Sequence, residues 1–563
     1  MAAVPVDPFV KGSRRAGFRR FRDGWTLTTV GIALILALPV LTVIAFLFVP
    51  AGDVWEHLFQ TVLQDYVVNS LVLMLGVAAG TGIIGVTTAW LVTLCRFPGR
   101  RIFEWALLLP LAMPAYIIAY TYTGMFDFAG PVQTLLRETT GWGYGDYWFP
   151  EIRSLGGAMA MLTLVLYPYV YLLARAAFLE QSVHALDAAR MLGCGPWKSF
   201  FLVALPAARP AVIAGMTLAQ METLADYGTV QYFGVSTFTT GIFRTWFGLG
   251  NSAAAAQLSA MLMFFVFALI LLEAWARRRQ RFHHTGSRSR PLPGFPLPPA
   301  RATLAFLACA TPLVLGFLLP FGQLLYWAYL TAEETLDADF IILVGNTVSL
   351  ATGAALLALL IALLLAYGKR LRHNMLVASA VRLAGMGYAI PGTVVAVGVL
   401  LPLGWVDNSV DSWMREQFGI STGLFLSGTL VALLFAYTVR FLAVSLQTVD
   451  AGLGKVRRSM DETARTLGYR AAEVLRHVHI PMIRGSLLTA LLLVFVDVMK
   501  ELPATLILRP FNFNTLAVRA FELASDERLM ESSAAAVAIV LAGIVPVILL
   551  SRSIARTRAT NSG

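Results

Sequence analysis

Residues 342 to 367 read ILVGNTVSLATGAALLALLIALLLAY and contain no charged side chain. This stretch decides the class of fold, because a helix of this length and composition can cross roughly 30 Å of hydrocarbon. Eleven further stretches are also long and apolar enough to cross it. They lie near residues 25–49, 67–94, 103–126, 155–178, 207–235, 252–275, 303–330, 376–403, 422–447, 483–508 and 533–551. The sequence therefore predicts an all-α, polytopic membrane protein with about twelve transmembrane helices.

The composition of the chain agrees with a membrane protein. Of its 563 residues, 58% are hydrophobic and 13% are charged, whereas a soluble domain carries about 25% charged residues. The formal net charge of +11 would suit nucleic-acid binding. The basic residues follow alternate loops rather than one face, so we expect no nucleic-acid partner. The three cysteines, Cys95, Cys194 and Cys309, lie far apart and predict neither a disulfide framework nor a metal site.

Basic and acidic loops alternate along the predicted spans. Cytoplasmic loops of membrane proteins carry an excess of Lys and Arg. Acidic residues gather at 53–65 and 333–339, in loops of the opposite set. The pattern predicts a multi-pass membrane protein with both termini in the cytoplasm. The basic loops are at residues 96–101, 190–209, 277–301, 369–372 and 455–476.

The chain divides into two similar halves around a basic, proline-rich linker that cannot build a core of its own. We expect the core of the first half at about 67–272 and that of the second at about 342–551. The predicted boundaries are a basic cytoplasmic N-terminus at 1–24, a first half at 25–275, a cytoplasmic linker at 276–301, a second half at 302–552 and a cytoplasmic tail at 553–563.

Several short motifs recur at a nearly constant shift, which indicates a parallel duplication. Asn69-Ser70-Leu71 resembles Asn346-Thr347-Val348, a shift of 277 that also relates Pro114 to Pro391. Later in each half, DAARMLG at 187–193 matches ETARTLG at 462–468 with a shift of 275. An even number of spans separates the copies, so both motifs face the same side of the membrane.

The recurring motif lies in the longest predicted cytoplasmic loop of each half. It consists of an acidic residue, two small residues, a glycine and, after eleven more residues, an apolar residue followed by proline. The small residues predict one side of a short helix that another surface can approach, and the glycine predicts a turn to a return helix. An ordinary helix cap and turn is the alternative interpretation. The residues are Asp187, Ala188, Ala189, Gly193, Leu205 and Pro206, and then Glu462, Thr463, Ala464, Gly468, Ile480 and Pro481.

This pattern resembles the coupling motif of ATP-binding cassette importer permeases, with Asp187 in place of glutamate and Thr463 in place of the first alanine. Residues 499–527, MKELPATLILRPFNFNTLAVRAFELASDE, resemble the fused permeases of the ferric iron importer family. In the first half LADYGTVQYFG at 224–234 occupies the corresponding place. The resemblance covers nearly the entire chain and identifies it as a fused, duplicated permease of type I.

The resemblance implies a transporter built from several subunits, in which this chain is the multi-pass component in the inner (plasma) membrane of a bacterium. Two cytosolic ATP-binding cassette ATPase subunits would lie beneath the two halves, and a periplasmic substrate-binding protein would lie above them. No G-x-x-x-x-G-K-[ST] motif occurs in the sequence. We therefore expect a transport permease rather than an enzyme, which binds no cofactor itself while ATP and magnesium bind to the partner subunits. Rocking of the two halves would give alternating access.

Charged residues inside predicted spans are candidates for the translocation path, since a charge at a helix centre costs about 2.5 to 3.5 kcal/mol on insertion scales. Asp226 interrupts the fifth span, and Lys500 and Glu501 interrupt the eleventh before Pro503. One hypothesis places Asp226 and Glu501 in the passage, where carboxylates meet a hard cation such as ferric ion. The favoured alternative is that Lys500 and Glu501 pair with neighbouring helices, brace the break at Pro503 or lie near the outer interface.

Histidines and prolines receive weaker assignments. His283 and His284, and likewise His477 and His479, lack a third ligand at a recognisable spacing, so we expect them to be solvated or lipid-facing rather than metal ligands. Pro114 and Pro391 predict kinks within the third and ninth spans, which neighbouring helices can tolerate.

The sequence thus predicts the permease of a binding-protein-dependent importer, with ferric iron as the expected substrate. The same machinery for thiamine, a polyamine or another small solute is the nearest alternative. A proton-coupled secondary transporter that uses Asp226 and Glu501 as relays is a further alternative, but it leaves the two coupling motifs unexplained.

Overall fold

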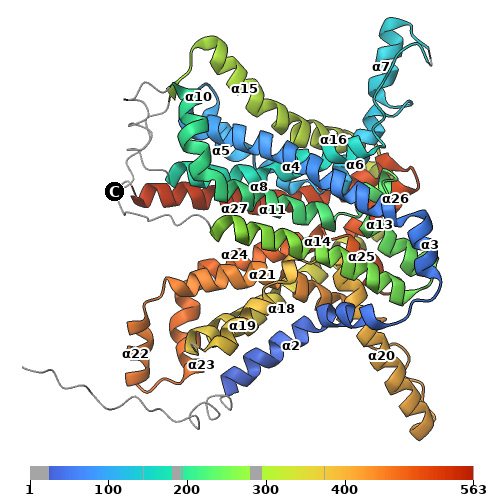
Figure 1. Cartoon of the computed structure of the whole chain (residues 1–563), viewed down its shortest axis with the longest axis vertical. Helices are drawn as coiled ribbons and strands as arrows, with labels where there is room; N and C mark the ends of the chain where they lie inside the picture. The colour runs from blue at the N-terminus through green and yellow to red at the C-terminus, as the bar shows by residue number, and fades with distance from the viewer. Residues whose placement is uncertain are drawn as a thin grey trace, which may run out of the picture.

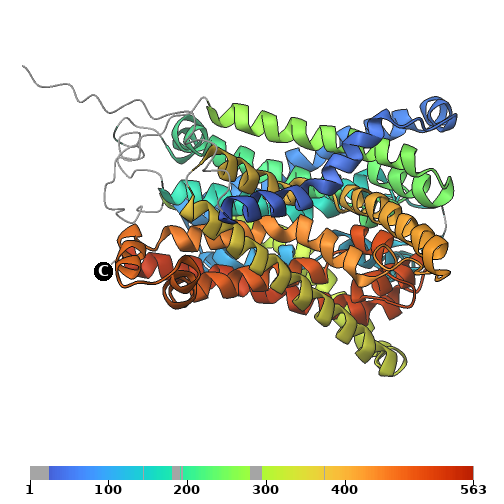
Figure 2. The same cartoon turned by 90° about the horizontal axis from the view of Figure 1, so that it is seen from below.

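The computed structural model describes residues 24–143, 145–180, 191, 195–278, 295–372 and 374–561. Most of these residues are helical, and the long helices run roughly along one axis of a single bundle (Figures 1 and 2). In the described part, eleven helices are long and apolar enough to cross a membrane, and the number is twelve if Arg100–Ala112 and Ala115–Thr140, which meet at an angle of 90°, count together as one span. The prediction of an all-α protein with about twelve spans is confirmed.

The first half contains the following elements in chain order. They are α2 (Gly24–Ala45), η1 (Phe46–Phe48), α3 (Val54–Thr61), α4 (Leu63–Leu94), β1 (Cys95–Arg96), α5 (Arg100–Ala106), η2 (Leu109–Ala112), α6 (Ala115–Phe126), α7 (Pro131–Thr140), α8 (Leu155–Glu180), α10 (Pro196–Ser199), η3 (Phe200–Ala204), α11 (Leu205–Ala225), α12 (Gly228–Tyr232), α13 (Phe238–Phe243), η4 (Arg244–Gly248) and α14 (Ser252–Arg278).

The second half repeats this order. Its elements are β2 (Phe295–Pro296), α15 (Pro299–Leu313), η5 (Val314–Leu318), α16 (Leu319–Leu330), α17 (Ala332–Thr335), α18 (Ala338–Leu371), α19 (Met375–Ala384), η6 (Gly387–Ala389), α20 (Gly392–Phe418), α21 (Leu430–Gly454), α22 (Arg458–Thr466), α23 (Ala471–Val474), η7 (Leu475–His479), α24 (Ile480–Met499), α25 (Pro503–Leu508), α26 (Leu516–Ser525) and α27 (Leu529–Asn561). The two short strands pair in parallel and join the end of α4 to the segment before α15.

The bundle has two distinct ends. We call the end that carries α10, α22 and α23 the α22 end, and the end that carries α3, α13 and α26 the α26 end (Figure 1). Both the first described helix, α2, and the last, α27, have their chain-terminal ends at the α22 end, which agrees with the predicted total of twelve spans.

Equivalent side chains make equivalent contacts in the two halves. The Asn69 amide donates to the carbonyl of Ser236 at 2.9 Å, and the Asn346 amide donates to the carbonyl of Asn514 at 3.4 Å. The next residue along α18, Thr347, accepts a hydrogen bond from a backbone amide at the start of α26, as Ser70 on α4 does from the start of α13. The predicted duplication therefore extends to individual hydrogen bonds.

The first helix of each half packs against the other half. Helix α2 lies along α19 and α20, and the α15–α16 segment contacts α4, α5, α6 and α8. The hydroxyl of Tyr122 in α6 donates to the carbonyl of Leu315 at 2.7 Å, and the rings of Phe103 and Phe306 meet at 5.3 Å. Through these contacts the first helix of each half holds the two halves together. The remaining helices of each half keep the repeated arrangement.

Pro114 and Pro391 end a helix instead of kinking it, which corrects the sequence-based prediction. Proline disfavours the helical conformation of the residue before it, and Met113 and Ile390 are extended, with ψ of 114° and 127°. Each proline is itself extended and a new helix begins at the next residue. The third and ninth spans therefore each consist of two helical pieces with a break between them.

Two further spans are broken, one before Pro503, where the sequence indicated a break, and one in the fifth span, where the sequence indicated only a charged residue. Helix α11 ends at Ala225, and α12 begins at Gly228. Helix α24 ends at Met499, and α25 begins at Pro503. Non-helical backbone at membrane depth is tolerated only where it is buried in protein or lines a cavity, so the four breaks point to the functional centre.

Candidate functional site: a charged cavity between the halves

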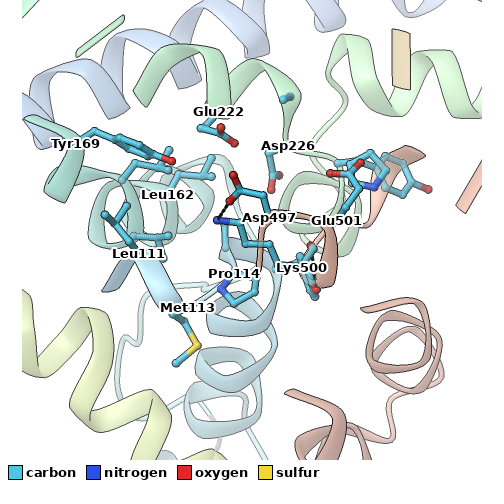
Figure 3. Close-up of a pocket in the computed structure, with 18 of the residues that line it drawn as sticks. Leu111, Met113, Pro114, Leu162, Tyr169, Glu222, Asp226, Asp497, Lys500 and Glu501 are labelled. Carbon is cyan, nitrogen blue, oxygen red and sulfur yellow. Dashed lines mark hydrogen bonds and ion pairs between the residues drawn. The ribbon is translucent and has the colours of Figure 1, made fainter. Parts of the chain in front are cut away.

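The four helix breaks meet at a cavity of about 120 Å³ between the two halves (Figure 3). Close packing holds the breaks together, since a β-carbon at Gly228 would lie 2.6 Å from Cβ of Tyr116, and the Tyr116 hydroxyl approaches the carbonyl of Lys500 at 3.5 Å. The polar and charged side chains that line the cavity come from both halves. They are Tyr116, Tyr169, Glu222, Asp226, Tyr227, Tyr388, Arg440, Asp497, Lys500 and Glu501.

Two carboxylates at a spacing of four residues enter the cavity from each half. Glu222 lies in the last turn of α11 and Asp226 directly follows that helix, while Asp497 lies in the last turn of α24 and Glu501 follows two residues after its end. The two pairs are related by the shift of 275 that also relates the repeated motifs. Sequence reasoning named Asp226 and Glu501 and missed Glu222 and Asp497, although the constant shift would have indicated both.

The first-half carboxylates are held by neutral donors. The Asp226 carboxylate accepts the Thr229 hydroxyl at 2.9 Å and the Val230 amide at 3.1 Å. Glu222 accepts the hydroxyl of Tyr388, which belongs to the second half, at 3.1 Å. In the part of the chain that the structure describes, neither carboxylate forms a direct ion pair, and the two bases that line the cavity pair with the second-half carboxylates.

The second-half carboxylates are paired with bases instead. Glu501 lies 2.7 Å from Nη1 of Arg440 and accepts the Ala504 amide at 2.9 Å, while Lys500 lies 2.9 Å from Asp497 (Figure 3). These are contacts of the kind that the bracing alternative expected for Lys500 and Glu501 before Pro503. Their part in translocation stays a prediction.

The two bases have no counterpart in the first half. Met159 beside Gly76 corresponds to Leu434 beside Gly353, which gives a shift of 275 between α8 and α21. At this shift Arg440 corresponds to Val165, and Lys500 corresponds to Ala225. The cavity is therefore symmetric in its acids and asymmetric in its bases, with the excess negative charge on the first-half side.

Gly392 leaves the space that the Arg440–Glu501 ion pair occupies. A β-carbon there would lie 2.6 Å from Oε1 of Glu501 and closer still to Nη1 of Arg440. We expect Gly392→Ala to lower the free energy of unfolding by about 1 to 3 kcal/mol, the usual cost of overpacking, in an SDS titration of the solubilised protein.

Gly404→Ala is the matched control, because Gly404 lies in the same helix and a β-carbon added to it would have no neighbouring atom within 4 Å. Alanine is the better helix former by about 1 kcal/mol, so this variant should be at least as stable as the parent. Equal stability of the two variants would contradict the tight contact at Gly392.

The second coupling motif forms a projecting helical hairpin at the α22 end (Figure 1). Helix α22 carries exposed Glu462 and Thr463 and buried Ala464. Gly468 then turns the chain with φ of +90°, a conformation that favours glycine. Ile480 and Pro481 begin α24 directly after the π-helical turn η7. The predicted order of short helix, glycine turn and return helix is present.

The first coupling motif is only partly described. Asp187, Ala188, Ala189 and Gly193 lie outside the described residues. Leu205 and Pro206 begin α11 directly after the π-helical turn η3, as Ile480 and Pro481 do in the second half. Proline lacks the N–H that would continue the helical ladder, and both halves have a π-helical turn immediately before it.

His479 contradicts the expectation of a solvated or lipid-facing histidine. Its ring is fully buried and lies 2.6 Å from a carboxylate oxygen of Asp461. Burial raises the pKa of Asp461, but hydrogen bonds from Arg370 and His479 outweigh that effect and hold the pKa below its ordinary value. His477 is exposed, as expected, and His283 and His284 lie outside the described residues. Within the described ranges, no three His, Cys, Asp or Glu side chains group closely enough to hold a metal ion.

A twice-repeated helical bundle whose broken helices enclose a charged cavity defines a multi-pass membrane permease. The chain belongs to the family described as "Binding-protein-dependent transport system inner membrane component", whose model matches residues 81–281 and 358–559. It is therefore an inner-membrane permease of a binding-protein-dependent importer. The family model matches once in each half, in agreement with the duplication.

Individual relatives agree with this membership. The chain is 26% identical to the Fe(3+)-transport system permease protein FbpB 2 of Haemophilus influenzae over 94% of this chain and 97% of the relative. It is 23% identical to the putative ferric transport system permease protein FbpB 1 of the same organism, over 85% and 76%. The molybdenum transport system permease protein ModB of Escherichia coli is 25% identical over 40% of this chain and 95% of its own length. The predicted resemblance to fused importer permeases is confirmed, and these relatives are transport permeases rather than enzymes.

Proposed function

We propose that the chain translocates ferric iron across the inner membrane through the cavity between its halves. The observation that carries this proposal is the set of four carboxylates, of which Glu222 and Asp226 have no basic partner in the described part of the chain. Carboxylate oxygens suit hard cations. Two relatives named as ferric iron transport permeases, which this chain matches over 97% and 76% of their lengths, support the same substrate.

The charge balance of the cavity suits the passage of a cation better than its tight binding. A translocation site must attract its ion and also release it. Arg440 and Lys500 pair directly with the second-half carboxylates, so a cation that enters meets carboxylates without a direct basic partner at Glu222 and Asp226. This arrangement favours brief contact and disfavours a closed ligand shell.

Energy for the movement would come from separate subunits. The α22–α23 hairpin and its first-half copy would dock on two cytosolic ATPases, which bind ATP and magnesium, while this chain binds no cofactor and hydrolyses no ATP. A periplasmic binding protein would deliver the ion at the α26 end. In this arrangement the α22 end and both termini are cytoplasmic, as the basic loops predict.

Uptake into sealed vesicles tests the proposal directly. The vesicles would contain this chain and its ATPase, oriented so that uptake carries the ion into the vesicle, and the binding protein would be added outside. Uptake of labelled ferric iron would be compared with uptake of labelled thiamine. We expect iron uptake that requires all three proteins and ATP. Uptake of thiamine alone would contradict the assignment of ferric iron as the substrate. Uptake driven by a proton gradient without the ATPase would contradict the assignment to the ATP-driven importers.

Asp226→Asn should reduce iron uptake about tenfold, in the range typical of losing one favourable interaction of about 1.4 kcal/mol. Asparagine has nearly the same volume, and its carbonyl oxygen can still accept the Thr229 or Val230 hydrogen bond, so the change is mainly one of charge. Asp339→Asn, at an exposed site on the first turn of α18, is the control. Equal uptake by the two variants would remove Asp226 from the path.

A further inference from the structure

The hairpin formed by α22 and α23 is tied to α18 by a cluster of polar side chains. Asp461 in α22 accepts the Nε–H of Arg370 at 2.8 Å through one carboxylate oxygen and the Nε2–H of His479 at 2.6 Å through the other. Tyr367, one turn before Arg370 in α18, donates its hydroxyl to the carbonyl of Ala471 at 2.7 Å. We call Tyr367, Arg370, Asp461 and His479 the brace.

The brace reaches every part of the hairpin. Asp461 lies in its first helix, Ala471 begins its second, and His479 ends the π-helical turn that leads into α24. Arg370 also donates to the carbonyls of Leu453 and Val456, which lie in the chain that enters the hairpin, at 2.6 and 2.9 Å. The hairpin is thus fastened to the end of α18 at its entrance, its middle and its exit.

Apolar packing alone would hold α22 weakly, because Ala464 is the one buried side chain of this helix. The brace is well shielded by comparison, with side-chain exposures of 12% for Arg370, 15% for Asp461 and 0% for His479. Hydrogen bonds between charged groups are roughly twice as strong as neutral ones. The orientation of α22 relative to α18 therefore depends mainly on this cluster.

The equivalent positions at the end of α4 and in η3 of the first half carry different side chains. At the shifts of 277 and 275, the counterparts of Tyr367, Arg370 and His479 are Trp90, Thr93 and Ala204. Trp90 packs on the rings of Phe178, Phe200 and Phe295 at centroid distances of 5.8, 4.8 and 6.2 Å. At the described counterpart positions of Tyr367, Arg370 and His479, the first half therefore lacks the tyrosine, arginine and histidine of the brace, while the counterpart of Asp461 lies outside the described residues.

We propose that Arg370, Asp461 and His479 are positioning residues that make the second hairpin and α18 move as one rigid lever. Helix α18 packs along α21 and α24, which carry Arg440, Asp497 and Glu501 at the cavity. A displacement of the hairpin by an ATPase would then reach the second-half wall of the cavity without loss. This inference rests on the proposed function, in which the hairpin docks on that ATPase.

Asp461→Asn is the primary test. An amide offers one acceptor oxygen where the carboxylate offers two, so it can satisfy either Arg370 or His479 and must present an NH₂ group to the other. His479 cannot readily adapt by moving its proton to Nδ1, since that buried atom has no hydrogen-bond partner in the described structure. Asp450→Asn is the matched control, because Asp450 pairs with Lys369 at 2.8 Å near the same end of α18 but is about half exposed.

The measurement is the number of ATP molecules hydrolysed per iron ion taken up by vesicles that contain the complete complex, together with the amount of ATPase that co-purifies. For Asp461→Asn we expect uptake to fall about tenfold, in the range typical of a coupling free energy, while ATPase co-purification and basal hydrolysis persist. The ratio of ATP to iron therefore rises, which a purely structural defect would not produce. Asp450→Asn should keep the parental ratio.

An unchanged ratio and uptake in Asp461→Asn would overturn the lever. If that variant fails to accumulate in the membrane, Arg370→Lys replaces it, since lysine keeps the charge near Asp461 and loses the two carbonyl hydrogen bonds. A parental ratio in Arg370→Lys would then overturn the proposal. Gly468→Asp tests the docking function separately. Unchanged uptake in Gly468→Asp would contradict the proposal that the hairpin docks on the ATPase. Loss of uptake in Gly468→Asp, together with parental uptake and ratio in Asp461→Asn, would contradict only the role of the brace.

Discussion

Replacing Arg440 by methionine is expected to lower the free energy of unfolding by about 3 to 5 kcal/mol, because removing one partner of a buried ion pair leaves an uncompensated charge. The Arg440 and Glu501 side chains are 10% and 4% exposed, and they meet at 2.7 Å in the middle of the bundle. Methionine has a similar length and no charge, so Glu501 would keep the Ala504 amide as a donor and lose its cation. The measurement is an SDS titration of the solubilised permease.

Two comparisons separate this effect from a general loss of packing. Arg440→Met combined with Glu501→Gln removes both charges and should recover most of the lost stability, since replacing a whole buried pair is often neutral. Lys369→Met breaks an ion pair that is about half exposed on both sides and should cost less than about 1 kcal/mol. A loss for Arg440→Met no larger than that for Lys369→Met would contradict a buried ion pair at the cavity.

Gly468→Asp is expected to reduce ATP-dependent uptake at least about 100-fold while the protein still inserts into the membrane. A residue with a β-carbon loses about 1 to 2 kcal/mol in the left-handed conformation that Gly468 adopts at φ of +90°. The carboxylate would also project from the tip of the hairpin into the surface proposed to meet the ATPase, where an unpaired buried charge costs several kcal/mol. Uptake and co-purification of the ATPase are the readouts.

Gly454→Asp is the matched control for this change. Gly454 ends α21, is exposed and has open space around it, and its φ is not positive. The same new charge there should leave ATPase co-purification intact. If Gly468→Asp also retained the ATPase and full uptake, the docking assignment of the second motif would be wrong. Gly193→Asp would test docking by the first motif, whose position is known from the sequence alone.

Sequence patterns predicted the features that depend on single segments. Hydrophobic length located the spans, since transfer of each helix into lipid is a property of that helix. A constant shift between motifs predicted the duplication, and the glycine at 468 predicted a turn. The same reasoning missed the break between α11 and α12, because Asp226 in an apolar stretch indicates a costly charge without telling whether the backbone bends around it.

Side chains whose importance comes from a partner were missed for a related reason. Arg440 stands in an apolar helix without any neighbouring motif, and only its contact with Glu501 marks it. His479 resembled a solvated residue until the fold placed Asp461 against its ring. Glu222 and Asp497 could have been found by applying the shift of 275 to Asp226 and Glu501, a signal that was present in the sequence.

The amino-acid sequence by itself determined the membrane class, the approximate number of spans, the duplication and the position of the α22–α23 hairpin, because each follows from local hydrophobicity or from a motif repeated along one chain. Only the tertiary structure decided that four helix breaks meet at one cavity, that its bases come from the second half, and that the second hairpin is fastened to α18. Those features depend on the contact of residues tens to hundreds of positions apart. The free energy of a buried charge is set by the partner that packing brings to it, and that partner is not written beside it in the sequence.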